Sequence, residues 1–189
     1  MIGCLTWGSL VWNPGKLPIR GGWQTDGPFL PIEFARLSKH NRITLVILYD
    51  QPHYAPSRSL WTLLDVQSPK EAFKALKDRE GAESNQGIGL WEKGTAEPAH
   101  EVDRRIARWA EVIGLDAVVW TKLGPKWVER GKEVERMPTQ DEVIRKIRTW
   151  DEPLGTYARL YLQMAPKQID TPYRRAVFDE FGWFVLSPY

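Results

Sequence analysis

Apolar residues occur in short, strand-like runs through the first third of the chain. These runs are rich in β-branched and aromatic residues and are separated by Gly, Pro and polar residues, as β-strands are. They cover Ile2–Trp7, Phe29–Ser38, Ile43–Tyr49 and Ser57–Val66. We expect Leu17–Pro28, which holds three Gly and two Pro, to form a loop, and Lys39-His40-Asn41 to form a turn.

A capped helix is predicted after these runs. Ser68 is the expected N-cap, Pro69 occupies the first helical position and Glu71 is the acid of a capping box. Apolar residues then keep a helical period, and Gly81 is a typical C-terminal end. We expect a loop of small residues at Gly81–Gly89.

The remaining residues are predicted to be mostly helical. Apolar side chains recur every three or four residues from about Pro98 to Ile113, and a buried strand is expected at Asp116–Thr121. Three more helices are expected: one capped by Thr139 with Glu142, one over Pro153–Met164, and one that Thr171-Pro172 opens and that runs to about Gly182. Strands that come early and helices that come late indicate an α+β protein.

Length and composition favour a single domain. The chain has 189 residues, of which 42% are hydrophobic, and ten are Trp, which is enough to fill one core. We expect one domain over residues 1–189, with a core at 1–121 and a helical C-terminal elaboration at 122–189 packed on it.

Charge and the lack of targeting signals argue against a nucleic-acid-binding, secreted or membrane protein. Lys and Arg number 26 against 24 Asp and Glu, a net charge of +2, so the strong basic character of a nucleic-acid-binding domain is missing. The N-terminus lacks the basic region of a signal peptide, and no apolar run approaches the roughly 20 residues of a membrane helix. The single cysteine, Cys4, cannot form an internal disulfide. We expect a cytoplasmic protein without a membrane or nucleic-acid partner.

Several kinds of catalytic site lack their sequence signature. Neither a glycine-rich phosphate loop nor a nucleophile elbow occurs. His40, His53 and His100 have no Cys or His partner at metal-ligand spacing, so we interpret them as surface residues and expect no metal or cofactor. Cys4 lies in an apolar run and is interpreted as a small core residue.

The segment Trp7-Gly8-Ser9-Leu10 directly follows the first predicted strand. A strand that ends in a Gly-Ser turn can present successive backbone N–H groups to an anion or a carboxylate. Judged on spacing alone, an ordinary tight turn in which Gly8 supplies a special φ angle is the simpler interpretation.

Glu80 ends the predicted capped helix, where Lys or Arg is the usual choice. A carboxylate there faces the negative end of the helix dipole, which raises its pKa and suits it to proton transfer near neutrality. Taken by itself, a solvated Glu without function explains the residue more simply. Glu33, in a predicted strand, is a competing carboxylate that we interpret as a surface-facing strand residue.

Together these segments resemble the gamma-glutamylcyclotransferase-like superfamily, most closely its ChaC-type branch. The stretch WGSLVWNPG at 7–15 is similar to that family's opening motif, an aromatic-Gly-Ser-Leu turn that runs into Trp-Asn-Pro-Gly. Later in the chain the family shows a strand, a capped helix and an Arg-Glu step that carries its catalytic glutamate. Arg79-Glu80-Gly81 stands at the corresponding place, and the resemblance covers roughly residues 1–90.

The resemblance implies a fold and an activity. The fold would be a small mixed, barrel-like β-sheet with flanking helices and a cavity at its mouth. The activity would convert a γ-glutamyl amide or amine to 5-oxoproline without metal or cofactor. The backbone of Trp7, Gly8, Ser9 and Leu10 would bind the substrate's α-carboxylate, and Glu80 would act as general acid and base.

The sequence also departs from the family pattern. Trp7 stands where the family has Tyr, the residues after Gly15 lack a close match, and the chain after Gly89 has no counterpart. A different γ-glutamyl or amide substrate, or a lost activity, would fit these departures.

The alternative function is a non-catalytic small-molecule or protein-binding member of the same fold. The C-terminal part is rich in Trp and Arg, which are enriched in protein interfaces and can stack on single-stranded nucleic acid, although core Trp and solvated Arg residues explain them more simply. These residues are Trp109, Trp120, Trp127, Arg130, Arg136, Trp150, Arg159, Arg174 and Arg175.

Overall fold

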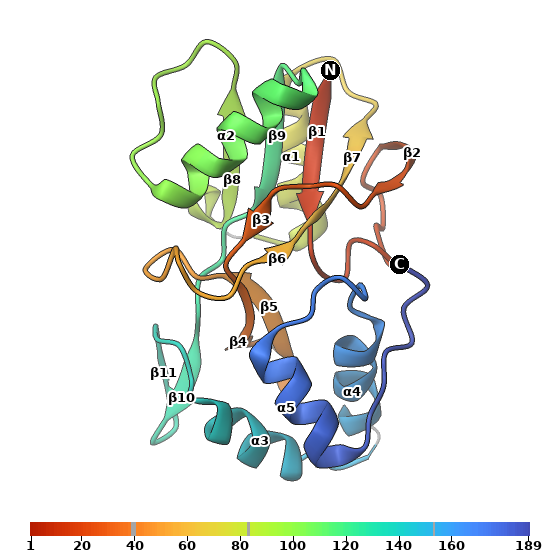
Figure 1. Cartoon of the computed structure of the whole chain (residues 1–189), viewed down its shortest axis with the longest axis vertical. Helices are drawn as coiled ribbons and strands as arrows, with labels where there is room; N and C mark the ends of the chain where they lie inside the picture. Colours follow the sequence, from red (N-terminus) through yellow and green to blue (C-terminus); the bar gives the residue numbers. More distant parts are fainter. Residues whose placement is uncertain (39–40, 83, 153) are drawn as a thin grey trace.

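The computed structural model describes residues 1–38, 41–82, 84–152 and 154–189. Its central element is a five-stranded sheet in the order β2-β7-β1-β9-β8. β1 is antiparallel to β7 and parallel to β9, so the sheet is mixed (Figure 1). The strands are β1 (Ile2–Thr6), β2 (Ile19–Gln24), β7 (Leu60–Leu64), β8 (Ile88–Glu92) and β9 (Ala117–Thr121).

Two helices cover opposite faces of this sheet. They are α1 (Pro69–Glu80) and α2 (Glu101–Ile113). Leu76 of α1 packs in one apolar cluster with Cys4 and Val119, whereas Ile106 of α2 packs in another with Leu5. Successive residues of β1 therefore point to opposite sides, as the alternation of a strand requires. The prediction that Cys4 is a core residue is confirmed, since its side chain is fully buried.

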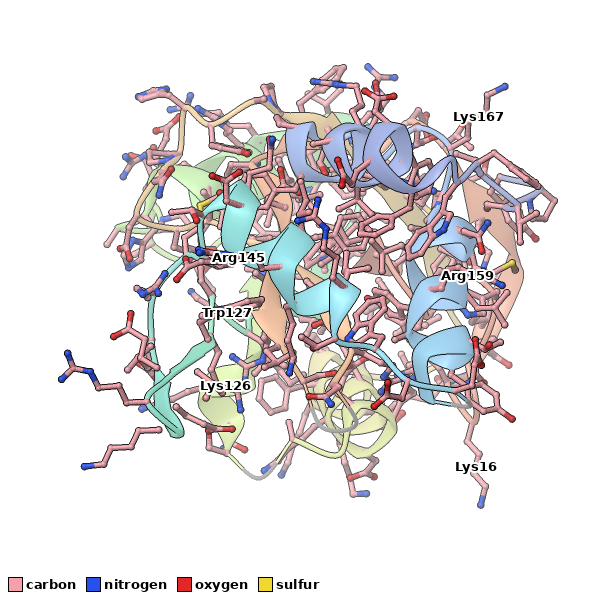
Figure 2. The ribbon with its side chains drawn as sticks, turned by 90° about the horizontal axis from the view of Figure 1, so that it is seen from below. Lys16, Lys126, Trp127, Arg145, Arg159 and Lys167 are labelled. Atoms are coloured by element: carbon pink, nitrogen blue, oxygen red, sulfur yellow. The ribbon has the colours of Figure 1, made fainter. Side chains whose placement is uncertain are left out.

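Most of the other elements lie at the opposite end of the molecule, with β3 (Phe29–Leu30) and β6 (Ser57–Arg58) between the two ends (Figure 1). Three helices lie at that opposite end, namely α3 (Gln140–Arg148), α4 (Leu154–Met164) and α5 (Pro172–Phe181). The remaining strands pair two by two: β3 with β6, β4 (Ile32–Leu37) with β5 (Ile43–Ile47), and β10 (Trp127–Glu129) with β11 (Lys132–Val134). Figure 2 shows α3, α4 and α5 from this end.

The expected α+β class with a mixed sheet is confirmed, but the described strands do not close into a barrel. The five-stranded sheet is open and ends at β2 and β8. β4 and β5 do not extend it because they pair with each other and pack against α5 and α4. None of the described helices has the length and apolar character needed to cross a membrane.

The capping signals predict the helix ends well. The Ser68 hydroxyl accepts a hydrogen bond from the Glu71 N–H (3.2 Å), and Gly81 ends α1 in the left-handed conformation. The expected capping box is incomplete, because the Glu71 carboxylate accepts from the Gln67 N–H instead of the Ser68 N–H. The two other predicted caps are confirmed too: Thr139 with Glu142 at α3, and Thr171 at α5. Of the expected turn at 39–41, Lys39 and His40 lie outside the described residues, as does Pro153 of the expected helix over 153–164.

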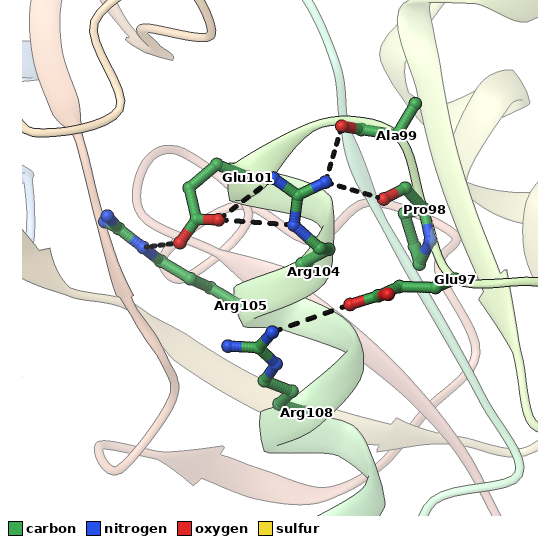
Figure 3. A network of polar contacts seen from close by, with 7 residues as sticks. All are labelled: Glu97, Pro98, Ala99, Glu101, Arg104, Arg105 and Arg108. Carbon is green, nitrogen blue, oxygen red and sulfur yellow. Dashed lines mark hydrogen bonds and ion pairs between the residues drawn. The ribbon is translucent and has the colours of Figure 1, made fainter.

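α2 begins at Glu101, later than the expected start at Pro98, and the side chain of Arg104 binds the carbonyls that precede the helix (Figure 3). Arg104 Nη1 donates to Pro98 O (3.1 Å) and Ala99 O (2.6 Å). Ion pairs continue along the same face of the helix: Glu101 with Arg104 and Arg105, and Glu97 with Arg108.

Four strands fall where loops or helices were expected. Leu17–Pro28 is not all loop: β2 is an exposed edge strand whose pairing with β7 shifts register between Arg20 and Gln24. β8 begins inside the predicted Gly81–Gly89 loop, because Gly89 lies against the Trp120 indole, where a Cβ atom would come within 2.1 Å of the ring. The hairpin β10–β11 interrupts the expected all-helical segment 122–189.

The aromatic and basic residues of the C-terminal part have mixed environments. Trp120 and Trp127 are buried in the main core, as the simpler interpretation expects. Arg174 is a correction, because it is buried and donates hydrogen bonds to the carbonyls of Ala165, Pro166 and Ile169. Figure 2 shows the labelled basic side chains spread over this end: Lys16, Lys126, Arg145, Arg159 and Lys167.

Candidate active site

The turn after β1 forms one end of the candidate site. Val11 N–H donates to Gly8 O (3.1 Å) and Asn13 N–H donates to Ser9 O (2.8 Å), which gives the segment a single helix-like turn. The N–H groups of Ser9 and Leu10, at the start of this turn, find no acceptor among the described residues. Unpaired N–H groups at the start of a helical turn attract anions.

Arg79 fastens the end of α1 to this turn. One terminal nitrogen donates to Glu80 Oε1 (3.1 Å), and the other donates to Ser9 Oγ (3.3 Å) and to the carbonyl of Asn13 (2.6 Å). The Arg79 side chain is only 14% exposed, so its bonds to Glu80 and Ser9 are partly shielded from water, whereas its bond to Asn13 lies at the surface. Two motifs that lie 70 residues apart in the chain are thereby brought together.

Glu80 is a largely enclosed carboxylate. Its side chain is 18% exposed. Burial raises the pKa of Glu80 above its usual value, and the positive charge of Arg79 opposes that rise. The direction agrees with the sequence-based expectation, but burial is the main cause, whereas we expected the helix dipole to act. Burial, and after it the charge of Glu80, raises the pKa of the Cys4 thiol, so the carboxylate lies near β1.

Tyr161 of α4 brings a hydroxyl to the same place. A Cβ atom on Gly8 would lie 2.7 Å from the Tyr161 hydroxyl oxygen, so the two groups are in direct contact. Burial, together with the nearby charge of Glu80, raises the pKa of Tyr161 to about 12, although a backbone hydrogen bond from Leu45 opposes the shift. The hydroxyl therefore stays protonated at neutral pH. The phenol at this place therefore comes from α4, whereas the turn itself carries Trp7.

A groove of about 1100 Å³ opens beside these residues. Ser9, Trp12, Arg79 and Tyr161 form part of its wall, and the outer face of α4 adds Tyr157 and Leu160. Trp12 and Tyr161 contact each other edge to face, with ring centroids 5.5 Å apart. A small molecule of peptide size would fit such a space.

The predicted site residues occupy different places around this groove. Ser9 lines it, and Glu80 lies next to Arg79, which also lines it. Trp7 and Leu10 are buried, at 5% and 3% exposure, so their side chains belong to the core and only their backbone faces the turn. Trp7 Nε1 donates to Leu45 O (3.4 Å). His53 and His100 are exposed, as expected, while His40 lies outside the described residues.

Glu33 is not the surface residue that the strand pattern predicted. Its side chain is fully buried at the start of α5. Each carboxylate oxygen accepts two hydrogen bonds, and burial raises the pKa of the group, against the effect of those bonds. The donors are Phe34 N–H, Tyr54 Oη, Thr171 Oγ1 and Tyr173 N–H. Glu33 therefore joins β4 to α5, and the structure gives it no place in the groove.

Replacing Gly8 with Ala should destabilise the protein. The added methyl group would meet the Tyr161 hydroxyl at 2.7 Å, and an overpacked site of this kind typically costs about 1–3 kcal/mol. Urea denaturation of the variant measures the loss in the free energy of unfolding. The double variant Gly8→Ala/Tyr161→Phe removes the clashing oxygen and should recover most of it. Equal losses in the single and double variants would contradict the contact.

Comparison with protein-family models, with curated proteins and with solved structures finds no match to this chain. Within the described residues, no group of three or more His, Cys, Asp or Glu side chains is placed to hold a metal ion. The groups that the described residues bring together at the groove are the turn at Ser9, Arg79, Glu80 and Tyr161.

Proposed function

We propose that the protein is a gamma-glutamylcyclotransferase-like enzyme that converts a γ-glutamyl amide or amine to 5-oxoproline. One observation carries the proposal: Arg79 bridges the carboxylate of Glu80 and the hydroxyl of Ser9, so the two segments that resemble the family's motifs meet at one groove.

The turn is suited to hold the γ-glutamyl group. Its unpaired N–H groups, on Ser9 and Leu10, can bind the α-carboxylate of the substrate. The α-ammonium group would then face Glu80, which can bind its proton. With the α-nitrogen held near the γ-carbonyl carbon, ring closure is an intramolecular reaction, and such positioning lowers the barrier substantially.

Glu80 moves the protons of the reaction. Its ionised form takes a proton from the α-ammonium, and the freed nitrogen attacks the γ-carbonyl carbon. The bond from that carbon to the leaving nitrogen breaks as the five-membered ring forms. Two protons pass in all from the attacking to the leaving nitrogen, and Glu80 can carry each in turn, so that it ends as it began. A pKa raised by burial suits a group that must both accept and return a proton.

The proposal is tested with a panel of γ-glutamyl dipeptides, γ-glutamylamines and glutathione. Each compound is incubated with the purified protein, and 5-oxoproline is measured by chromatography. Formation from at least one compound supports the enzyme. If no compound is turned over but some raise the melting temperature, the non-catalytic binding alternative holds; if none does either, the groove is not a γ-glutamyl site.

The rate should fall at acid pH with a midpoint above that of an ordinary glutamate. Only ionised Glu80 can accept the substrate's proton, and its pKa is raised above 4.5 by burial. The acid limb of kcat/KM, measured from about pH 4 to 8, reports this group in the free enzyme. A profile that stays flat down to pH 4.5 would contradict the assignment of Glu80 as the base.

A further inference from the structure

The groove carries more positive charge than its own acids neutralise. Lys74 pairs with Asp78 at 2.5 Å, and Arg79 pairs with Glu80. The remaining acid of the wall, Glu71, accepts a hydrogen bond from the Gln67 N–H at the start of α1. Two basic side chains of the groove, those of Lys16 and Arg42, have no carboxylate partner among the described residues.

Arg42 is the more enclosed of these two. Its carbonyl accepts hydrogen bonds from Ser38 N–H (2.8 Å) and Ser38 Oγ (3.1 Å), which hold the backbone just before β5. The guanidinium carbon lies 6.0 Å from the centroid of the Tyr161 ring. Among the described residues, Arg42 Nε is buried and has no hydrogen-bond partner. A buried donor left unpaired is costly unless a ligand or water satisfies it.

The position of Arg42 relative to Tyr161 indicates which part of a ligand it would meet. The Tyr161 hydroxyl contacts Gly8, at the turn that would hold the γ-glutamyl group. Arg42 lies against the ring of the same tyrosine, and Trp12 against its edge. A ligand that extends from the turn along this ring reaches the guanidinium with the portion beyond its γ-carbonyl, which is the leaving amine.

We infer that Arg42 binds a carboxylate on the leaving amine, so that the enzyme selects γ-glutamyl amino acids or peptides over γ-glutamylamines that lack this charge. The inference rests on the proposed function. A guanidinium presents paired N–H donors in a plane that matches a carboxylate, and charge-assisted bonds of this kind are the strong ones. The exposed Lys16 is a point charge at the rim and supplies no such geometry.

A matched pair of substrates tests the inference. γ-Glutamylalanine and its C-terminal amide differ only in the negatively charged carboxylate that Arg42 would bind. We expect kcat/KM of the wild type to favour the acid by about tenfold or more, since a hydrogen bond to a charged group is worth that much. Arg42→Gln should bring the ratio of kcat/KM for the acid to that for the amide close to one. Arg42→Lys keeps the positive charge but lacks the paired N–H donors of the guanidinium, so it should give an intermediate ratio.

Lys74→Gln is the matched control, because it removes one positive charge from the same groove at a residue already paired with Asp78. It should keep the wild-type ratio. A ratio near one in the wild type, or a ratio that is unchanged in Arg42→Gln, would overturn the inference and leave the proposed function standing.

Measurements of binding distinguish a failure of the proposed function from a failure of the inference about Arg42. Calorimetry on Glu80→Gln, with and without Arg42→Gln, compares the affinities for the acid and the amide without turnover. If the wild type forms no 5-oxoproline but Glu80→Gln binds the acid more tightly in an Arg42-dependent way, the proposed function fails and the anion site stands. If neither compound binds or is turned over, both are wrong.

Discussion

Replacing Glu80 with Gln should lower kcat for 5-oxoproline formation by about 10²- to 10⁴-fold, the usual contribution of a positioned acid–base group. The amide has nearly the same shape and can still accept a hydrogen bond from Arg79, so the turn and the groove should be retained. It cannot take up a proton, and the step that frees the α-nitrogen is lost. Product formation under saturating substrate is the measurement.

Stability distinguishes this loss of chemistry from a loss of fold. Because burial raises the pKa of Glu80, its contribution to stability is present below the pKa of the unfolded chain and is lost as the pH rises through the folded value. At neutral pH the ionised group is therefore unfavourable to folding, and Glu80→Gln should melt no lower than the wild type. A much lower melting temperature would mean that the carboxylate holds the site together.

Glu111→Gln is the matched control for this substitution. Glu111 also lies in the last turn of a helix that ends at a glycine, Gly114, but its side chain is exposed on α2. The same chemical change there should leave turnover unaltered. Full activity of Glu80→Gln in the panel would remove the proton-transfer role, whatever substrate is used.

Local signals explain which parts of the fold could be predicted. Helix α1 needs only its own cap, period and terminal glycine, and it forms where these residues predict. β2 and β8 were missed because glycine and polar residues mark loops, whereas here β7 supplies the hydrogen bonds of one strand and the Trp120 indole fills the space beside Gly89 in the other. Contacts of this kind, made by residues distant in the chain, cannot be predicted from the local pattern of apolar and polar residues.

The residues of the candidate site likewise include some that local sequence signals could predict and some that they could not. Ser9 and Glu80 each lie in a short segment with a recognisable composition, so sequence reasoning could propose both. Arg42 and Tyr161 lie in segments with no motif, and only the packing of α4 against β5 brings them to the turn. The amphipathic period predicts that α4 is a helix, but it does not show which aromatic residue of that helix reaches the groove.

Glu33 could not be identified as buried for a related reason. A polar residue in an otherwise apolar strand is expected to point to the outward side of that strand. Here the outward side is covered by α5, whose Tyr173 N–H and N-cap Thr171 hydroxyl donate to the carboxylate. The carboxylate thus satisfies helix-terminal donors that the helix itself cannot.

Replacing Glu33 with Ala should lower the free energy of unfolding by about 3 kcal/mol or more, because it leaves several buried donors without an acceptor. Tyr54→Phe, which removes one donor and leaves the carboxylate in place, should cost only about 1 kcal/mol. Both losses are measured by urea denaturation at neutral pH. Equal, small losses would show that water or another group replaces the carboxylate.

The contribution of Glu33 to stability should decrease as the pH rises. Since burial raises the folded pKa of Glu33 above 4.5, the group's contribution to stability is complete below the unfolded pKa and declines as the pH rises through the folded value. The side-chain amide in Glu33→Gln does not titrate, so the stability difference between the wild type and this variant should be largest at acid pH and shrink towards neutrality. Glu80 titrates in both proteins and cancels from that difference. A difference that grows with rising pH would mean that the four hydrogen bonds outweigh burial and keep the buried carboxylate ionised.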